Sequence, residues 1–498
     1  MKKSKKIIIF VALSLVIILG ILFILNFKNM SRLIFKSTIR PMAVAGQFYP
    51  ADRAALERVI KTNLEAAPPV KASGTIKIII VPHAGYDYSA GVAALAYKAL
   101  AGQKIQRVYL LGNSHHDYFS GLAVDNHDFW ETPLGRVAVD TEKVKELAAA
   151  SPLLEINNAP HQSEHGLETQ VPFLQTVLGS DFKIVPLLFG NTDDNDYEAV
   201  AKILAANLAD GDLIVVSSDM SHYPPYEAAN KIDRQTLELI KNKDLTGLSE
   251  EAKSALSAQT NEQTILCGLE AVKTALALAE QLNLELQVLG YKNSGDTFLG
   301  DKNQVVGYGA VIFTSSDLNS AEQKILLNIA RTSVENYVRN KKISEFEIKD
   351  ERLKTSQGAF VTLKKNGELR GCIGQIIAIN PLWQVVRDMA MAAAAEDNRF
   401  YPVAADELAR LDYEISVLSR PRLISDWRQI RLGRDGVIVR KGLKSGVFLP
   451  QVASESGWTE EKFLSELCAQ KAGLAPDCYK NDPEVELSVF QAQIFEGK

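Results

Sequence analysis

The stretch Ile76–Val81, with the sequence IKIIIV, runs directly into Pro82-His83-Ala84-Gly85-Tyr86. A short, continuous apolar run is typical of a strand that is buried on both faces of a sheet. An alanine-rich segment from about Ala90 to Leu100 follows, and we expect it to form a helix. This part of the chain therefore predicts a strand, a loop that carries a histidine, and a helix.

The same pattern recurs further along the chain. The strand-like runs and the loops that follow them are Arg107–Leu111 (RVYLL) before Gly112–His116, Lys183–Phe189 before Gly190-Asn191, and Asp212–Val216 (DLIVV) before Ser217–His222. Strands that alternate with helices predict a mostly parallel sheet with flanking helices. The expected fold class of this part is therefore α/β.

Histidines follow the ends of three of these strands: His83, His115 with its neighbour His116, and His222. In open α/β sheets, ligands bind beyond the carboxyl ends of the strands. We therefore expect these side chains to meet at one edge of the sheet. A single buried histidine is more often a hydrogen-bonded core residue, so the prediction of a site depends on the three together.

Three further residues are candidates for the same site. His165 and Glu168 stand three positions apart in a predicted helix and therefore share a face. Cys267 comes just before another predicted helix, whose amino terminus would lower the pKa of the thiol and favour the metal-binding thiolate. His127 and His161 have no comparable position, and we expect them at the surface.

The amino terminus contains a long apolar segment. Residues 7–25 (IIIFVALSLVIILGILFIL) carry no charge and are long enough to cross a hydrocarbon core of about 30 Å. A cleaved signal peptide, the alternative, has an apolar region of about 7–15 residues. We therefore predict a single-pass anchor within residues 1–30, lipid as its partner, and a membrane location. Lysines precede the segment and basic residues also follow it, so the side of the domains stays open, with the amino-terminal cluster favouring the outside.

Composition limits the remaining possibilities. A chain of 498 residues with 46% hydrophobic and 23% charged residues can form two or three ordinary domains. The net charge of -5 argues against a protein that mainly binds nucleic acid. Four scattered cysteines exclude a disulfide framework, and no CxxC pair is present to hold an iron–sulfur cluster.

A polar join at Ser315–Ser320 (SSDLNS) separates a first domain, residues 40–315, from a second one, residues 320–498. In the second, Gly358–Lys364 and Glu368–Ile377 flank Lys365-Asn366-Gly367. Asn-Gly between two strand-like runs predicts a tight hairpin. Hairpins and helices lie in separate blocks, which indicates a smaller α+β domain.

Five motifs of the first domain resemble the Memo family: VPHAGY at 81–86, GNSHH at 112–116, SEHGLETQVPFL at 163–174, SSDMSH at 217–222 and ILCG at 265–268. The resemblance covers about residues 40–314. It implies a fold like that of the class III extradiol dioxygenases, which hold non-haem iron at the mouth of such a sheet.

The resemblance also implies roles for individual residues. By position, His83, His115 and Cys267 match the family's proposed metal ligands. The residues that it suggests for acid–base or pocket roles are His222, Asp219, His165 and Glu168. A cysteine in place of the carboxylate of the dioxygenases makes copper as reasonable as iron. Asn113 stands where the family often has proline, which affects the loop before His115.

The second domain resembles the AMMECR family through LRGCIG at 369–374, Asp397-Asn398-Arg399-Phe400 and YEISVL at 413–418. Many relatives have proline where Asn398 stands. Cys372 is a candidate nucleophile, and Arg370 and Arg399 are candidate anion ligands. The domain has no histidine to act as a base for Cys372, so a structural role is the alternative. Both families occur together with a radical S-adenosylmethionine protein, and the resemblance implies such a partner.

The leading hypothesis is an iron- or copper-dependent redox or dioxygenase-like enzyme with an unknown small-molecule substrate, acting with that radical partner. One alternative is a non-catalytic metal-handling or scaffold protein with an AMMECR-type interaction domain. Another is a metal-independent hydrolase that uses Ser217 or Ser218 with His222.

Overall fold

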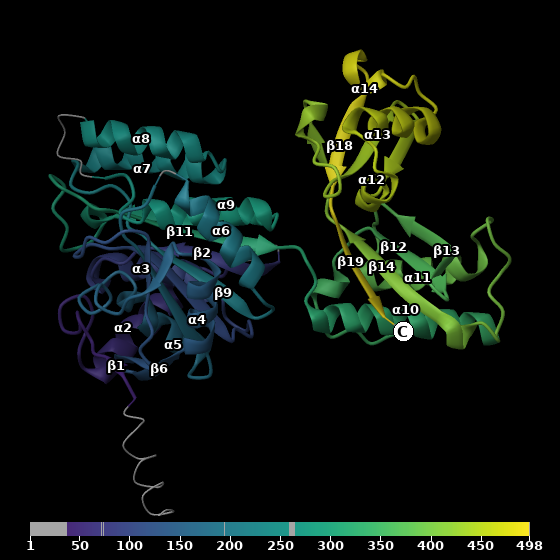
Figure 1. Ribbon diagram of the computed structural model, residues 1–498. Coiled ribbons are helices and arrows are strands. Elements are labelled where there is room, and N and C mark those ends of the chain that lie inside the picture. Colours follow the sequence, from purple (N-terminus) through teal and green to yellow (C-terminus); the bar gives the residue numbers. More distant parts are fainter. Residues whose placement is uncertain (1–36, 71, 73, 194, 258–263, 498) are drawn as a thin grey trace, which may run out of the picture. The chain divides into compact units, whose positions relative to one another are not determined.

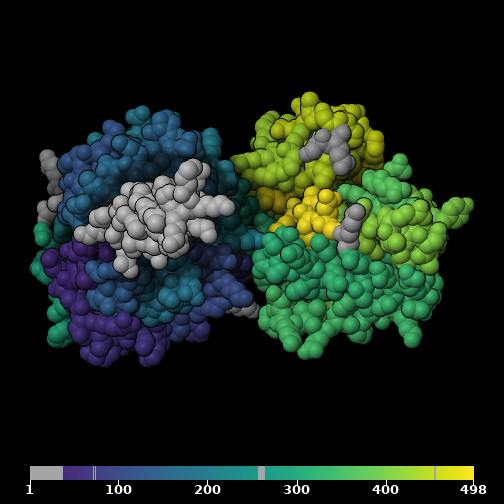
Figure 2. Space-filling view, turned by 60° about the horizontal axis from the view of Figure 1, so that its bottom comes forward, coloured from purple at the N-terminus to yellow at the C-terminus, as the bar shows by residue number. Residues whose placement is uncertain are grey.

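The computed structural model describes residues 37–70, 72, 74–193, 195–257 and 264–497, which form two compact units that divide between Ser315 and Ser316 (Figure 1). Each unit is built from one continuous part of the chain, purple to teal for the first and green to yellow for the second (Figure 2). The units are described one at a time below.

The predicted membrane-spanning helix is not supported. Within the described ranges, no helix combines the length and apolarity that crossing a membrane requires. Residues 7–25, to which that helix was assigned, lie outside the described residues. The expectations of a single-pass anchor and a membrane location are thus not supported, and lipid as a partner stays a prediction.

The first unit is built on one sheet with the strand order β1-β5-β6-β8-β3-β9-β2-β11-β10. Its centre consists of four parallel strands, β8 (Lys183–Phe189), β3 (Arg107–Asn113), β9 (Asp212–Ser217) and β2 (Thr75–Val81). All six residues of β9 are buried, so both faces of the sheet are covered there. The α/β architecture that the apolar runs predicted is the one observed.

Shorter or antiparallel strands complete this sheet. They are β1 (Ile39–Arg40), β4 (Leu122–Val124), β5 (Phe129–Thr132), β6 (Gly135–Val139), β7 (Leu154–Ile156), β10 (Glu285–Asn293) and β11 (Gly307–Ser315). Strand β11 runs antiparallel to both β2 and β10. The sheet is therefore parallel at its centre and mixed at its edges.

Helices of the first unit lie between the strands in sequence: α2 (Arg53–Ala66), α3 (Tyr86–Ala99), α4 (Thr141–Ala150), η1 (Glu168–Gln170), α5 (Val171–Leu178), α6 (Asp196–Asn207), α7 (Tyr226–Lys241), α8 (Leu245–Ser257), α9 (Leu269–Gln281) and η2 (Ser294–Asp296). Helix α3 packs against β2, β10 and β11, whereas α9 packs against β2, β3 and β9. The loops at the carboxyl ends of β2, β3 and β9 carry the motifs with histidine.

The second unit begins with α10 (Ser320–Asn340), whose start is fixed by Asn319. The Asn319 side chain accepts from the backbone N–H groups of Ala321 and Glu322, and the Glu322 carboxylate accepts from Asn319 N at 2.6 Å. This reciprocal pair is a capping box, which satisfies N–H groups that have no partner within the helix. The polar join found in the sequence therefore ends in a helix-start signal.

Two four-stranded sheets form the second unit, in the orders β13-β12-β14-β19 and β15-β18-β16-β17. The strands are β12 (Ala359–Lys365), β13 (Glu368–Gln375), β14 (Leu411–Leu418), β15 (Arg422–Ile424), β16 (Gly436–Lys441), β17 (Lys444–Phe448), β18 (Glu486–Phe490) and β19 (Ala492–Gly497). The α-helices are α11 (Leu382–Ala395), α12 (Pro450–Ser456), α13 (Glu460–Glu466) and α14 (Cys478–Asn481). Short 3-10 turns lie at η3 (Arg352–Lys354), η4 (Leu408–Arg410) and η5 (Trp427–Gln429), and η6 (Leu467–Ala472) is a π-helix.

The predicted hairpin of the second unit is confirmed. Strands β12 and β13 pair antiparallel around Asn366 and Gly367, which have φ values of 53° and 83°. Two consecutive residues with positive φ are what a tight two-residue hairpin turn requires, and asparagine and glycine adopt this conformation most readily.

Candidate metal centre

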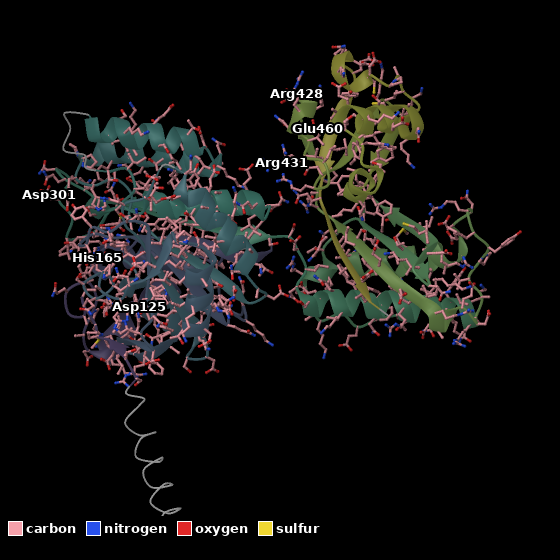
Figure 3. The ribbon with its side chains drawn as sticks, viewed as in Figure 1. Asp125, His165, Asp301, Arg428, Arg431 and Glu460 are labelled. Atoms are coloured by element: carbon pink, nitrogen blue, oxygen red, sulfur yellow. The ribbon has the colours of Figure 1, made fainter. Side chains whose placement is uncertain are left out.

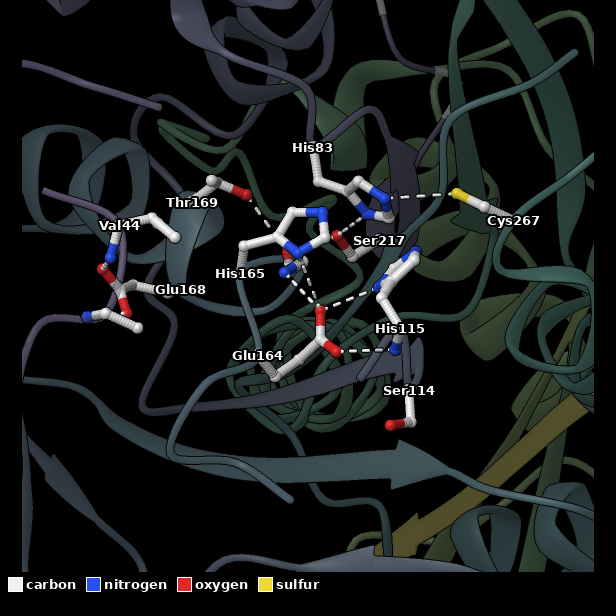
Figure 4. A network of polar contacts seen from close by, with 12 residues as sticks. Val44, His83, Ser114, His115, Glu164, His165, Glu168, Thr169, Ser217 and Cys267 are labelled. Atoms are coloured by element: carbon white, nitrogen blue, oxygen red, sulfur yellow. Dashed lines mark hydrogen bonds and ion pairs between the residues drawn. The ribbon is translucent and has the colours of Figure 1, made fainter. Parts of the chain in front are cut away.

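Three histidines meet beyond the carboxyl ends of β2 and β3. His83 follows β2, His115 follows β3, and His165 lies in the loop before η1. Each offers a ring nitrogen, and these nitrogens lie within 4.8 Å of one another. The ring centroids are 4.5 to 5.2 Å apart (Figure 4). This spacing fits several imidazoles that face one metal ion.

Hydrogen bonds determine which nitrogen of His83 is available. Ser217 Oγ lies 2.5 Å from the Gly166 carbonyl oxygen and donates its single proton to it. The same hydroxyl oxygen accepts from Gln170 Nε2 at 2.8 Å and lies 2.9 Å from His83 Nδ1. Because the hydroxyl has no second proton, His83 Nδ1 must be the donor. His83 Nε2 is therefore unprotonated, as a metal ligand must be.

The Glu164 carboxylate contacts two of the three imidazoles, those of His115 and His165, and holds their orientation. It accepts from His115 Nδ1 at 2.8 Å and from His115 N at 2.9 Å, and it lies 3.4 Å from His165 Nδ1 (Figure 4). Burial alone would raise the pKa of Glu164, but the hydrogen bond and the charge of His115 hold it well below its usual range. A carboxylate that holds Nδ1 leaves Nε2 of His115 available, the usual outer-shell arrangement of metal-binding histidines.

Electrostatics favour the neutral form of two members of the cluster. Burial, followed by the charge of His115, lowers the pKa of His83 to about 3. Burial, followed by the charge of His83, lowers the pKa of His165 to about 3 as well. For His115 burial acts in the same direction, but Glu164 outweighs it and raises the pKa above 6.5. His83 and His165 are therefore ready to bind a cation at neutral pH without losing a proton.

Cys267 borders the cluster. Its Sγ lies 3.1 Å from His83 Nε2 (Figure 4). The same sulfur lies 3.1 Å from Asp219 N. The thiol precedes α9 by two residues, as expected, but its pKa is raised well above 9.0 rather than lowered, because burial and the charge of Asp219 outweigh the helix terminus. Cys267 would therefore bind as a thiolate only if the metal ion displaces its proton.

Asp219 and His222 lie in the loop that follows β9. Asp219 Oδ1 accepts from the backbone N–H groups of His83 at 2.8 Å and Ala84 at 3.2 Å, and burial raises its pKa. His222 Nδ1 lies 2.9 Å from the Met220 carbonyl oxygen, and the charge of its ring contributes to the lowered pKa of His83. Both residues thus border the cluster, but neither belongs to the three-histidine group.

Glu168 and His116 are not brought into this group. Both carboxylate oxygens of Glu168 are used elsewhere: it pairs with Arg40 at 2.6 Å and accepts from Tyr49 Oη at 2.5 Å. These groups are buried, so Glu168 is part of the packing around β1. His116 is exposed, with its ring 5.7 Å from that of His165.

His127 and His161 are buried, so the expectation that they lie at the surface is wrong. Asp125 accepts from His127 Nδ1 at 2.7 Å and from Trp130 Nε1 at 2.7 Å. His161 is fully buried and its Nε2 lies 3.1 Å from the Ala123 carbonyl oxygen. In the sequence, the spacing Asp125-x-His127 was the feature that could have indicated these hydrogen bonds of Asp125.

The candidates of the second unit lie in ion pairs. Arg370 pairs with Glu407 at 2.8 Å, and Arg399 pairs with Asp397 at 2.7 Å. Asp397 also accepts from Cys372 N at 2.8 Å, and burial raises the pKa of the Cys372 thiol. These contacts favour structural roles for the two arginines and leave the thiol protonated.

The fold and the cluster define the first unit as an α/β protein whose parallel sheet presents a histidine-rich site, able to hold a metal ion, at its carboxyl edge. The chain belongs to the Memo family: the model of Memo-like proteins matches residues 40–312. The second unit carries an AMMECR1 domain, which matches residues 327–495. Both resemblances found in the sequence are thereby confirmed.

Two MEMO1 family proteins agree with the assignment of the first unit. A MEMO1 family protein of Sulfurisphaera tokodaii is 35% identical over 290 residues, which cover 55% of this chain and 99% of the relative. One from Saccharolobus solfataricus is 36% identical over 288 residues, covering 55% and 98%. Among solved structures, an uncharacterised protein of Pyrococcus horikoshii is 40% identical, with a TM-score of 0.33, covering 35% of this chain and 90% of that one.

Proposed function

We propose that the first unit is an iron- or copper-dependent redox protein of the dioxygenase-like type. The observation that carries the proposal is the cluster of His83, His115 and His165, with ligand nitrogens within 4.8 Å of one another. Imidazole ligands suit iron, copper and zinc, and the neighbouring sulfur of Cys267 favours the softer ions among them. A bound iron or copper ion would supply electron transfer and Lewis acidity at this place.

The residues around the cluster have roles that follow from their contacts. Ser217 and Glu164 hold the rings of His83 and His115 in the orientation and tautomer that expose a bare nitrogen. Asp219, whose pKa is raised by burial, is the first acid–base candidate. His222 borders the same space and is the second acid–base candidate.

A non-catalytic metal-handling protein is the second candidate function. It is favoured by the number of donors, because three imidazoles and one thiol are enough to close a four-coordinate site, whereas catalytic sites keep one position open. The AMMECR1 domain would then serve as an interaction module. A radical S-adenosylmethionine partner stays a prediction in both cases.

A metal-independent hydrolase is disfavoured by the serines on which it depended. Ser217 and Ser218 are buried, and their hydroxyl groups donate to the backbone carbonyl oxygens of Gly166 and Asp219. Neither hydroxyl therefore offers its proton to a general base, which a nucleophilic serine requires.

The test is the metal content of the full chain purified without oxygen, compared with His83→Ala, His115→Ala and His165→Ala. His127→Ala is the matched control, because His127 is also buried but lies outside the cluster. We expect near-stoichiometric iron or copper in the wild type and the control, and loss in the three variants. Turnover of oxidisable aromatic compounds would then favour the enzyme, and bound metal without turnover the metal-handling protein. A wild-type chain that takes up no ferrous, cuprous or zinc ion would refute the proposal.

A further inference from the structure

Asp233, on helix α7, is a fully buried carboxylate outside the metal cluster. Its Oδ1 accepts from the backbone N–H of Ser221 at 2.9 Å. Its Oδ2 accepts from the Ser221 hydroxyl at 3.0 Å and from the Tyr291 hydroxyl at 2.7 Å. One side chain thus joins α7, the loop after β9 and strand β10.

The surroundings of Asp233 are neutral. In the part of the chain that the structure describes, its three hydrogen-bond donors carry no charge, and burial raises the pKa of Asp233 to about 6. The titratable group in contact with it is Tyr291, whose pKa is raised in turn by burial and by the charge of Asp233. Gly307 closes the remaining side, where an added Cβ would lie 2.0 Å from Asp233 Oδ2. Burying a carboxylate without a cation costs free energy, so the hydrogen bonds of Asp233 have to offset that cost.

Ser221 connects Asp233 to the candidate metal centre, because it lies in the same loop as Asp219. Its backbone oxygen accepts from Gly307 N at 2.9 Å, so its N–H, its carbonyl and its hydroxyl are all held. Two residues earlier in the same loop, Asp219 donates its N–H to Cys267 Sγ and accepts from His83 N. The position of the loop therefore determines how Asp219 meets these two candidate ligands.

We propose that Asp233 is a positioning residue of the metal centre, which clamps Ser221 and thereby holds Asp219 and His222 against His83 and Cys267. The proposal rests on the proposed function for its consequence, metal affinity, but the clamp itself exists without metal. An asparagine would keep the clamp, since its amide oxygen can accept from Ser221 N while its NH₂ group donates to the two hydroxyls. An alanine would remove it.

The first arm of the test measures the clamp in metal-free full-length protein. The rate at which iodoacetamide alkylates Cys267 is followed by peptide mass spectrometry, with Cys372 of the second unit as internal reference. We expect Asp233→Ala to raise the rate at Cys267 by about tenfold or more, since an unsatisfied buried donor shifts a local equilibrium by about that factor. Asp233→Asn and Asp301→Ala, at an exposed aspartate of the same unit, are expected to keep the wild-type rate.

The second arm measures affinity for ferrous and cuprous ions by competition with a chromophoric chelator. Loss of an outer-shell contact typically weakens metal binding by about 10–100-fold, which we expect for Asp233→Ala and not for Asp233→Asn. An unchanged Cys267 rate in Asp233→Ala, or an equal rise at Cys372, would overturn the clamp. A wild-type chain without metal would refute the proposed function alone, because thiol reactivity is measured in its absence.

Discussion

Replacing Asp233 by asparagine should change how the stability of the first unit depends on pH. Burial raises the pKa of this carboxyl to about 6 in the folded protein, whereas the unfolded chain has the ordinary value of 3.8. Between these values the folded state binds the proton more tightly, so stability falls as the pH rises. Asparagine stays neutral at every pH and lacks this dependence, while it keeps the hydrogen bonds to Ser221 and Tyr291.

The size of the effect follows from the two pKa values. One pKa unit corresponds to about 1.4 kcal/mol, so the wild type loses about 3 kcal/mol in full as Asp233 ionises. The loss begins near the lower pKa and is complete above the higher one, and about 2 kcal/mol of it falls between about pH 4.5 and about pH 7.5. Relative to the wild type, Asp233→Asn should gain that amount of unfolding free energy over the same range.

The assay is urea unfolding at several pH values, read by hydrogen exchange of peptides from β9 and β11, so that the first unit is followed separately from the second. Asp301→Asn is the control, since this exposed aspartate lies at the periphery of the first unit (Figure 3). Parallel curves for the wild type and Asp233→Asn would refute the reasoning, because they would mean that Asp233 titrates alike in the folded and unfolded chain.

Three further outcomes are expected. Glu164→Gln should weaken metal binding by about 10–100-fold in a chelator competition, because an amide cannot accept from both His115 N and His115 Nδ1; unchanged affinity would contradict the orienting role. Arg40→Met should lower the unfolding free energy of the first unit by about 3–5 kcal/mol, since it leaves Glu168 buried without its cation, and denaturant unfolding against the exposed Arg53→Met measures this. Added ferrous or cuprous ion should raise the unfolding temperature of the wild type and a chelator should reverse it; a similar rise in His83→Ala would contradict the assigned site.

The sequence predicted the edge of the sheet at which the candidate metal centre lies, because its histidine motifs directly follow buried apolar strands. His83 and His115 each stand two residues beyond a buried apolar strand, and neighbouring parallel strands end at one edge. So short a connection leaves the side chains little freedom. His222 stands five residues beyond β9, and a connection of that length can change direction. His222 therefore lies beside the cluster, and the third histidine of the cluster is His165.

The partners that orient these ligands could not be predicted in the same way. Glu164 and Ser217 reach His115 and His83 across 49 and 134 positions of sequence. Whether a glutamate next to a histidine points into a cluster or into solvent depends on packing in three dimensions, which periodicity does not encode. The same limit applies to His161, whose carbonyl oxygen accepts from Arg40 Nε across 121 positions of sequence. His127 differs, because its partner Asp125 is a close neighbour in sequence.

Two effects act on the pKa of the Cys267 thiol in opposite directions, the helix terminus and burial, and only a comparison of their magnitudes shows which one decides the protonation state. The thiol does precede a helix, and a helix terminus favours a nearby anion by about 0.3–1 kcal/mol. Burial disfavours the same anion by more, up to about 3–5 pKa units for a fully buried group, and the carboxylate of Asp219 adds to it. The resting thiol is therefore protonated, and its Sγ lies 3.1 Å from the bare Nε2 of His83. A metal ion that binds to the sulfur must therefore displace the thiol proton. Metal uptake by Cys267→Ser, which lacks that step but keeps the three imidazoles, separates the contribution of the sulfur from that of the histidines.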